Sequence, residues 1–193
     1  MIDEMAGLAI ERAGGGRLVV LIDGRSGAGK STLAAELANC LAGRLGRPIQ
    51  VVSLDDCYPG WGGLAAAAAM VLTMLVPAAP GYQRYDWALG RPAEWVPLDP
   101  ASPIIIEGSG ALTRAAAPKA GLRVWLDAPE PVRRQAVEHR DGPAGSWWAA
   151  WAAQEMAHMA ADDPESLADV AISSPPRRGG AKRRGGCARV SRV

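Results

Sequence analysis

Short apolar runs recur along the chain and alternate with longer stretches of helix-forming residues. We predict strands over 18–23 (LVVLID), 49–55 (IQVVSLD), 103–108 (PIIIEG), 122–127 (LRVWLD) and the weaker run 168–172 (ADVAI). Strands that are apolar on both faces are typical of a parallel sheet buried between helix layers. Helices are predicted where good helix formers end near Gly or Pro, over 2–12, 31–46, 63–76, 129–140 and 146–161. This alternation predicts an α/β fold with a doubly wound, mainly parallel five-stranded sheet flanked by helices.

Two segments do not fit the alternation. Residues 77–100 are rich in proline, and we expect a loop, which at this length is usually functional or disordered. Residues 175–193 contain repeated Arg and Gly without an apolar period, so we predict a basic disordered tail after one folded domain over 1–174. A solvated tail explains this composition, and contact with RNA or acidic lipid is the alternative.

The charge changes once this tail is set aside. It holds seven of the 21 Lys and Arg and none of the 20 Asp and Glu. Residues 1–174 therefore carry 14 cations against 20 acids, a formal charge of −6. An acidic domain argues against nucleic acid as a partner.

Cysteine usage and apolar run length indicate the compartment. Cys40, Cys57 and Cys187 form no CxxC pair, which favours a reducing environment. Two acids precede any apolar run at the N-terminus, and the longest apolar run, 64–76, is shorter than the roughly 20 residues that span a bilayer. We expect a cytoplasmic protein without a membrane partner.

The strongest motif lies directly after the first predicted strand. Residues 24–31 read GRSGAGKS and match the phosphate-binding loop G-x-x-x-x-G-K-[ST], with a predicted helix following. Glycines let successive N–H groups face one anion, Lys30 supplies a cation for the β- and γ-phosphates, and Ser31 offers a hydroxyl to Mg²⁺. We predict binding of ATP and Mg²⁺ by Gly24, Ser26, Gly27, Ala28, Gly29, Lys30, Ser31 and Thr32.

Acidic residues end several predicted strands, where doubly wound proteins bind ligands. Phosphoryl transfer needs one carboxylate to deprotonate the acceptor hydroxyl and another near the metal. Asp55 or Asp56 fits the first role and Glu107 the second, whereas Asp127 fits a cap or turn. The N-K-x-D motif of GTPases is missing, since the single Asn39 is followed by Cys40. A small-molecule kinase fits best.

These motifs together resemble the uridine kinase-like group of P-loop nucleoside kinases. The segments that carry the resemblance are DGRSGAGKST, SLDDCYPGW, YDW, IIIEG and RD, within about residues 17–172. The resemblance implies that Asp55 is the catalytic base and that Asp56 and Tyr58 lie beside the acceptor. It also implies that Tyr85 and Asp86 contact the sugar hydroxyls of the acceptor.

The resemblance further implies an arginine-rich lid over the phosphates. Arg133, Arg134, Arg140 and Asp141 occupy like positions, and lid arginines neutralise charge on the transferred group. We include Arg140 with Asp55 and Lys30 as catalytic, and Ser31 with Glu107 as metal-binding. After Asp141 the chain reads GPAGSWW, without further arginines, and the loop after Asp86 contains no His.

Several assignments stay open at this point. Trp61, Trp87 and Trp95 could stack on an acceptor or pack internally. The helical spacing of the tryptophans at 147, 148 and 151 favours packing in the core. The function that we predict is ATP-dependent phosphorylation of a small-molecule hydroxyl, nucleoside kinase-like. The alternatives are another acceptor (a nucleotide, pantothenate or an adenylylsulfate-like compound), a nucleotide-binding protein without transferase activity, and a kinase that has lost activity. Neither the acceptor nor the oligomeric state follows from the sequence.

Overall fold

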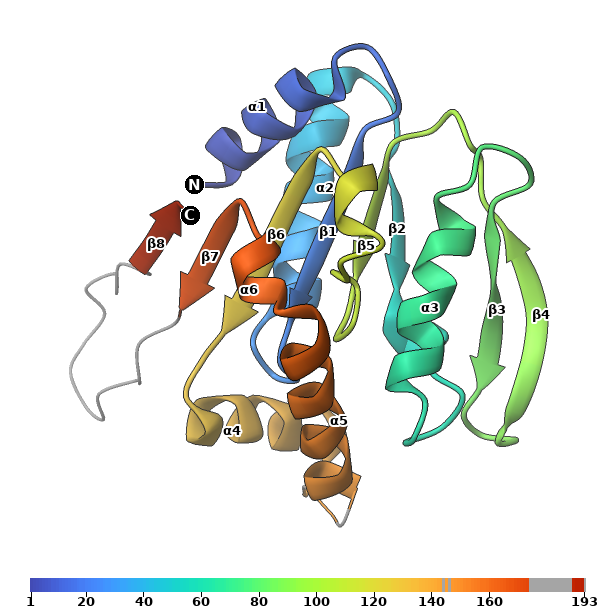
Figure 1. Cartoon of the computed structure of the whole chain (residues 1–193), viewed down its shortest axis with the longest axis vertical. Coiled ribbons are helices and arrows are strands. Elements are labelled where there is room, and N and C mark those ends of the chain that lie inside the picture. The colour runs from blue at the N-terminus through green and yellow to red at the C-terminus, as the bar shows by residue number, and fades with distance from the viewer. Residues whose placement is uncertain (144, 146, 174–188, 193) are drawn as a thin grey trace.

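A computed structural model describes residues 1–143, 145, 147–173 and 189–192. A central sheet is packed between helices, and a separate hairpin lies beyond one side (Figure 1). In strand order, the sheet contains β2 (Gln50–Ser53), β5 (Ile104–Glu107), β1 (Val19–Gly24), β6 (Leu122–Asp127), β7 (Val170–Ser173) and β8 (Arg189–Arg192). The first five are parallel, as predicted, and β8 pairs antiparallel with β7.

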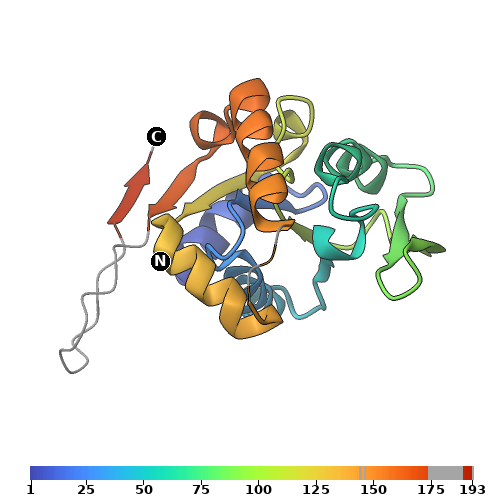
Figure 2. The same cartoon turned by 90° about the horizontal axis from the view of Figure 1, so that it is seen from below.

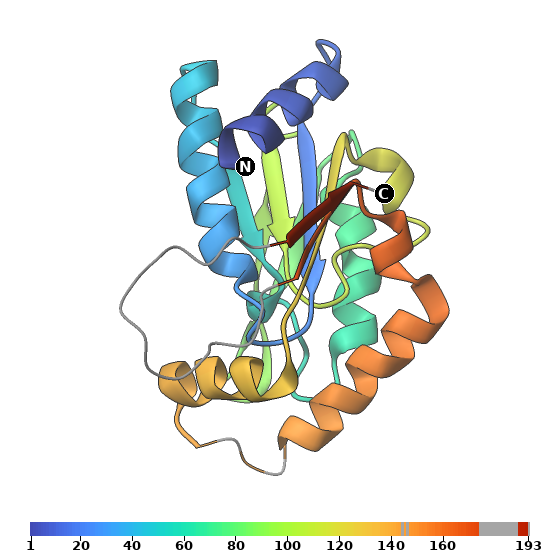
Figure 3. The ribbon, with the colours of Figure 1, turned by 90° about the vertical axis from the view of Figure 1, so that its left-hand side faces the viewer.

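Helices cover both faces of the sheet, as Figure 3 shows edge-on. One layer holds α1 (Ile2–Ala13) and α2 (Lys30–Leu45), and the other holds α3 (Leu64–Met74) and α5 (Trp147–Asp162). Along β1, Val20 and Ile22 join the core with the first layer, while Val19 and Leu21 join the core with the second. Both faces of β1 are therefore buried, which explains its continuous apolar run.

The remaining helices lie near the ends of the strands. α4 (Glu130–Asp141) crosses below the carboxyl ends of the strands, and the short α6 (Pro164–Leu167) precedes β7. Two 3₁₀ turns, η1 (Leu54–Asp56) and η2 (Ala117–Lys119), lie between these elements. The five predicted helices match α1 to α5 within two residues at each end. No helix in the described part of the chain is both long and apolar enough to cross a membrane.

The predicted loop over 77–100 is wrong, because most of it forms an antiparallel hairpin. β3 (Gly81–Asp86) pairs with β4 (Arg91–Pro97). Both strands of a two-stranded sheet are edge strands, so Pro92 and Pro97 can lie in β4 without breaking a central ladder. The prolines that suggested a loop therefore mark an edge strand.

The structure also differs from the prediction of a disordered tail at residues 189–192. These residues form β8 on the open edge of β7. Backbone groups alone can form such pairing, because an edge strand presents unpaired N–H and C=O groups. Composition does not reveal it. The rest of the predicted tail, 175–188 and 193, lies outside the described residues.

The order of the strands locates the ligand site. β1 lies between β5 and β6, so the strands that follow β1 in the chain are placed on both of its sides in the sheet. Ligands of open α/β sheets bind at such a switch point, beyond the carboxyl ends of the strands. Figure 2 looks onto that end and shows α4 on the α2 side and α5 on the α3 side.

Candidate nucleotide and acceptor site

The phosphate-binding loop connects β1 to the N-terminus of α2. Gly27 has φ +81°, and a Cβ at this position would lie 2.2 Å from the backbone oxygen of Arg133 in α4. Gly24 has φ +150°, and its Cβ would lie 2.1 Å from the backbone oxygen of Leu126. Only glycine lets the loop lie this close to its neighbours. The loop therefore delivers its N–H groups and the positive end of the α2 dipole to one place.

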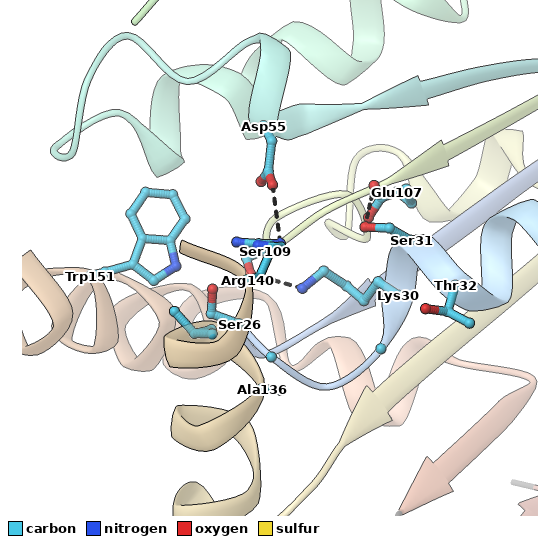
Figure 4. Close-up of a pocket in the computed structure, with 13 residues that line it drawn as sticks. Ser26, Lys30, Ser31, Thr32, Asp55, Glu107, Ser109, Ala136, Arg140 and Trp151 are labelled. Atoms are coloured by element: carbon cyan, nitrogen blue, oxygen red, sulfur yellow. Dashed lines mark hydrogen bonds and ion pairs between the residues drawn. The ribbon is translucent and has the colours of Figure 1, made fainter. Parts of the chain in front are cut away.

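A cavity of about 220 Å³ opens over this loop (Figure 4). Its walls come from the loop, η1, the end of β5, α4 and α5. The lining residues are Ser26, Gly27, Gly29, Lys30, Ser31, Thr32, Asp55, Glu107, Ser109, Ala136, Val137, Arg140 and Trp151. The structure thus brings together the residues that we predicted as catalytic and metal-binding. Of the predicted nucleotide-binding residues, Gly24 and Ala28 do not line this cavity.

Lys30 and Ser31 begin α2 at the floor of the cavity. The Lys30 ammonium donates to the backbone oxygen of Arg25 at 3.2 Å and to Ser109 Oγ at 3.4 Å. Ser31 Oγ donates to Glu107 Oε1 at 2.9 Å. A hydroxyl and a carboxylate beside a phosphate site fit Mg²⁺, which binds through few protein oxygens and keeps waters and phosphate oxygens as further ligands.

Asp55 and Arg140 face each other across the cavity. Asp55 lies in η1 directly after β2, and its Oδ2 is 3.8 Å from Arg140 Nη1 in α4. The Asp55 side chain is 60% exposed and the Arg140 side chain 56%. The backbone oxygen of Asp55 accepts a hydrogen bond from Trp87 Nε1 at 2.8 Å, which ties η1 to the hairpin. A carboxylate so placed can reach a hydroxyl on the open side of the cavity.

The other predicted acceptor residues lie in different environments. Tyr58 is buried, and its hydroxyl donates to the backbone oxygen of Ser109 at 2.9 Å. Burial and the charge of Asp55 raise the pKa of the Tyr58 phenol, so it remains a donor. The Asp86 carboxylate accepts from the backbone N–H groups of residues 88 and 89 and thereby shapes the hairpin turn. Asp56, Tyr85 and Asp86 do not line the cavity over the phosphate loop.

Of the three arginines expected in a lid, only Arg140 lines the cavity. Arg133 is fully buried and donates to the backbone oxygens of Ser26 at 3.2 Å and Ala128 at 2.9 Å. It supports the phosphate loop from behind. Arg134 forms an exposed ion pair with Glu138 at 3.0 Å. The side chain of Asp141 is not described.

Glu155 of α5 is a site residue that the sequence reasoning missed. Its buried Oε1 accepts hydrogen bonds from the Ser26 backbone at 2.6 Å, Trp151 Nε1 at 3.1 Å and Ser109 Oγ at 3.2 Å. Its Oε2 lies 3.4 Å from Arg25 Nε and 3.9 Å from Arg133 Nη1. The carboxylate therefore joins the phosphate loop to α4, α5 and the loop after β5.

A second buried network holds α5 against the end of β1. The Asp23 carboxylate accepts from the backbone N–H groups of Gly24, Gly110 and Leu112 at 2.6, 3.0 and 2.8 Å. His158 contacts Asp23 through Nε2 at 2.9 Å and Asp162 through Nδ1 at 3.2 Å. Burial lowers the pKa of His158, but the hydrogen bond and negative charge of Asp23 outweigh it, so the pKa lies above 6.5.

A spacing signal could have identified both networks. The buried positions of α5 are Trp148, Trp151, Glu155 and His158. Their separations of three, four and three residues form one helical stripe. Two ionisable residues on the stripe that carries the core tryptophans must find partners inside the protein, because unpaired buried charge is costly.

Comparisons with known proteins agree with this fold. Neither a protein-family model nor a curated protein sequence matches the chain. Among solved structures, a possible uridine kinase from Bacillus stearothermophilus matches with a TM-score of 0.61 and 23% identity, covering 88% of this chain and 96% of that one.

Two further structures carry other kinase names. A putative fructose transport system kinase from Silicibacter sp. matches with a TM-score of 0.58 and 18% identity, over 86% of this chain and 92% of that one. D-glycerate 3-kinase from Cryptococcus neoformans matches with a TM-score of 0.56 and 12% identity, over 91% and 95%. The likeness confirms the fold that the motifs predicted: the chain has the fold of the uridine kinase-like P-loop kinases.

Proposed function

We propose that the protein is an ATP-dependent kinase that transfers the γ-phosphate to the hydroxyl of a small molecule. The observation that carries this proposal is that the phosphate loop and the Asp55 carboxylate line one cavity. Lys30 and Ser31 of the phosphate loop lie at its floor. The Asp55 carboxylate lies at one wall and faces Arg140 of α4. The kinase names of the structural neighbours support the same reaction class.

The floor of the cavity has the groups that hold a triphosphate. The loop N–H groups and the N-terminus of α2 favour phosphate oxygens, and the Lys30 ammonium adds a full charge beside them. Mg²⁺ held by Ser31 and Glu107 would neutralise negative charge on the phosphates. Ser31 and Glu107 are already within hydrogen-bond distance, at 2.9 Å.

Asp55 supplies the base. Its carboxylate orients the acceptor hydroxyl and accepts the hydroxyl proton, while the acceptor oxygen bonds to the γ-phosphorus and the bond to the ADP oxygen breaks. Lys30 and Arg140 stabilise the charge that spreads over the transferred group. A positioned base contributes about 10²–10⁴ in rate.

Replacing the base tests the proposal. We expect Asp55→Asn to lower kcat by about 10²–10⁴ and to leave the Kd for Mg·ATP unchanged, as measured by ADP release and by calorimetry. Asp56→Asn distinguishes the adjacent carboxylates: loss of turnover in that variant alone would move the base to Asp56. ADP release that no acceptor stimulates, with Mg·ATP tightly bound, would favour a nucleotide-binding protein without transferase activity.

The acceptor is a separate question. The motif resemblance favours a nucleoside, through Tyr85 and Asp86. The Asp86 carboxylate is already engaged with two backbone N–H groups of the hairpin turn, and neither residue lines the cavity with Asp55. The nature of the acceptor therefore has to be argued from the residues that do surround Asp55.

A further inference from the structure

A second cavity adjoins the nucleotide cavity on its open side. It has a volume of about 360 Å³ and shares Ser26, Asp55, Arg140 and Trp151 with the first. Its other lining residues are all aromatic: Tyr58, Trp61, Trp87 and Trp147. Because Asp55 lies on both cavities, a molecule in the aromatic cavity would present its hydroxyl to the proposed base.

Two of these aromatic side chains are unusually exposed. Trp61 is 48% exposed and Trp87 is 41% exposed, although indole side chains normally bury most of their surface. Exposed apolar surface that borders a cavity is typical of a binding site. Trp61 contacts Trp87, Trp147 and Trp151, with ring centroids 5.0, 4.4 and 6.3 Å apart. The exposed rings are therefore held in place by packing against one another.

The charge of the cavity argues against an anionic occupant. Among the described residues that line it, the charged ones are Asp55 and Arg140, which form an ion pair at 3.8 Å. Arg84, on the nearby hairpin, is engaged by Glu94 at 2.6 Å. A carboxylate or phosphate on the acceptor would face one cation that already has an acidic partner, and it would be repelled by the Asp55 carboxylate beside it.

The ring geometry argues against a base held between two parallel rings. Trp61 and Trp147 are near-parallel at 21°, but they are in contact at 4.4 Å and leave no slot between them. Trp151 stands at 85° to Trp61 and at 74° to Tyr58. Walls at right angles suit a compact molecule that lays one C–H face on an indole and turns its hydroxyls toward Asp55.

We propose that the acceptor is an uncharged sugar or other polyol without a nucleobase, held by the aromatic cavity against Asp55. This proposal rests on the proposed kinase function, because it identifies the aromatic cavity as the acceptor site. Trp61 is the residue on which recognition depends most, since it contacts the other three tryptophans of the cavity.

Binding and transfer can be measured on the same panel. Calorimetry in the presence of Mg·ADP would compare aldoses, ketoses and alditols with three matched sets: D-ribose against uridine, D-ribose against D-ribose 5-phosphate, and glycerol against D-glycerate. ADP release from Mg·ATP would follow transfer to each compound. We expect an uncharged sugar or alditol to bind and to be phosphorylated, and each base-bearing or anionic partner to bind more weakly.

Variants of two exposed tryptophans locate the site. Trp61→Ala should weaken sugar binding by about tenfold or more, because a ligand face no longer covers an indole, and Trp61→Phe should restore most of it. Trp95→Ala is the matched control, since Trp95 is 49% exposed and does not line the cavity. The sugar affinity of Trp95→Ala should equal that of the wild type. Equal affinities in wild type and Trp61→Ala would overturn the proposal.

The remaining outcomes separate the acceptor from the reaction. Preferred phosphorylation of uridine or of an anionic compound would overturn the acceptor class and leave the kinase function standing. Sugar binding without transfer from Mg·ATP would support the acceptor class and contradict the kinase function. Failure of every sugar and alditol to bind, with Mg·ADP bound normally, would overturn the acceptor class.

Discussion

The nucleotide side and the acceptor side of the cavity are built in different ways. The nucleotide side is centred on one continuous segment, residues 24–32, whose backbone supplies N–H groups, and Glu107 and Arg140 join it from β5 and α4. The acceptor side gathers single side chains from η1, the segment before α3, the hairpin and α5. A local motif can specify the phosphate loop of the first region. The second exists only when distant parts of the chain have folded together.

The two regions meet at α5. Trp147 and Trp151 of this helix line the aromatic cavity, while Glu155 and His158, one and two turns further on, bind the phosphate loop and the end of β1. A change at Gly27, which lines the nucleotide cavity and not the aromatic one, should therefore affect one region, and a change in α5 should affect both. Three substitutions of decreasing effect test this comparison.

The largest effect is expected from Gly27→Ala, which breaks the nucleotide side alone. The added Cβ would lie 2.2 Å from the backbone oxygen of Arg133, at φ +81°. Strain of about 1–3 kcal/mol together with this overlap should lower Mg·ADP affinity on the order of 100-fold, as measured by calorimetry.

Gly43→Ala in α2 is the matched control for Gly27→Ala. Gly43 is helical, and among the described residues no atom beyond its own helical turns lies within 4 Å of the added Cβ. Nucleotide affinity should stay unchanged, and stability should rise by about 0.5–1 kcal/mol. Equal affinities of the two variants would contradict the role of the Gly27 backbone.

Glu155→Gln is expected to have the next largest effect, because it weakens the junction between the regions. The change removes the charge that faces Arg25 and the fully buried Arg133. Because Arg133 keeps Asp127 at 3.4 Å, the loss of this charge should lower the free energy of unfolding by about 1–2 kcal/mol, as measured by urea denaturation.

The exposed pair of Arg134 and Glu138 provides the control for this effect. Glu138→Gln should cost less than about 1 kcal/mol, as exposed ion pairs do. A similar small loss in Glu155→Gln would show that α5 and the phosphate loop are held together by other contacts.

The smallest effect is expected from His158→Gln, which should change the pH dependence of the unfolding free energy. Its folded-state pKa is raised above 6.5 by Asp23 and Asp162, against the opposite effect of burial. The stabilisation from protonated His158 is therefore complete below pH 6.5 and is lost as pH rises through the higher folded-state pKa. Urea unfolding of wild type and His158→Gln between pH 5 and 9 measures it: the difference in unfolding free energy should shrink as pH rises. A difference that does not vary with pH would contradict this.

Much of the fold was predictable because it depends on local patterns. Continuous apolar runs indicated the five parallel strands, and helix-forming stretches indicated α1 to α5. The exceptions are the hairpin and β8. Both lie on sheet edges, where strand formation depends on a backbone partner and side-chain patterns are weak.

The site also has one part that local sequence predicts and another that depends on distant contacts. Residues 24–31 alone predicted a phosphate-binding loop, because the chemistry of such a loop resides in the backbone conformation that Gly, Lys and Ser allow. The fold as a whole places Asp55 and Arg140 on one cavity, buries Arg133, and engages Asp86 in a turn. Only it collected the four tryptophans of the aromatic cavity, from positions 61 to 151. The physical reason is that burial, pairing and ring contacts are relations between distant segments, and a pattern along the chain gives little information on which side chains meet.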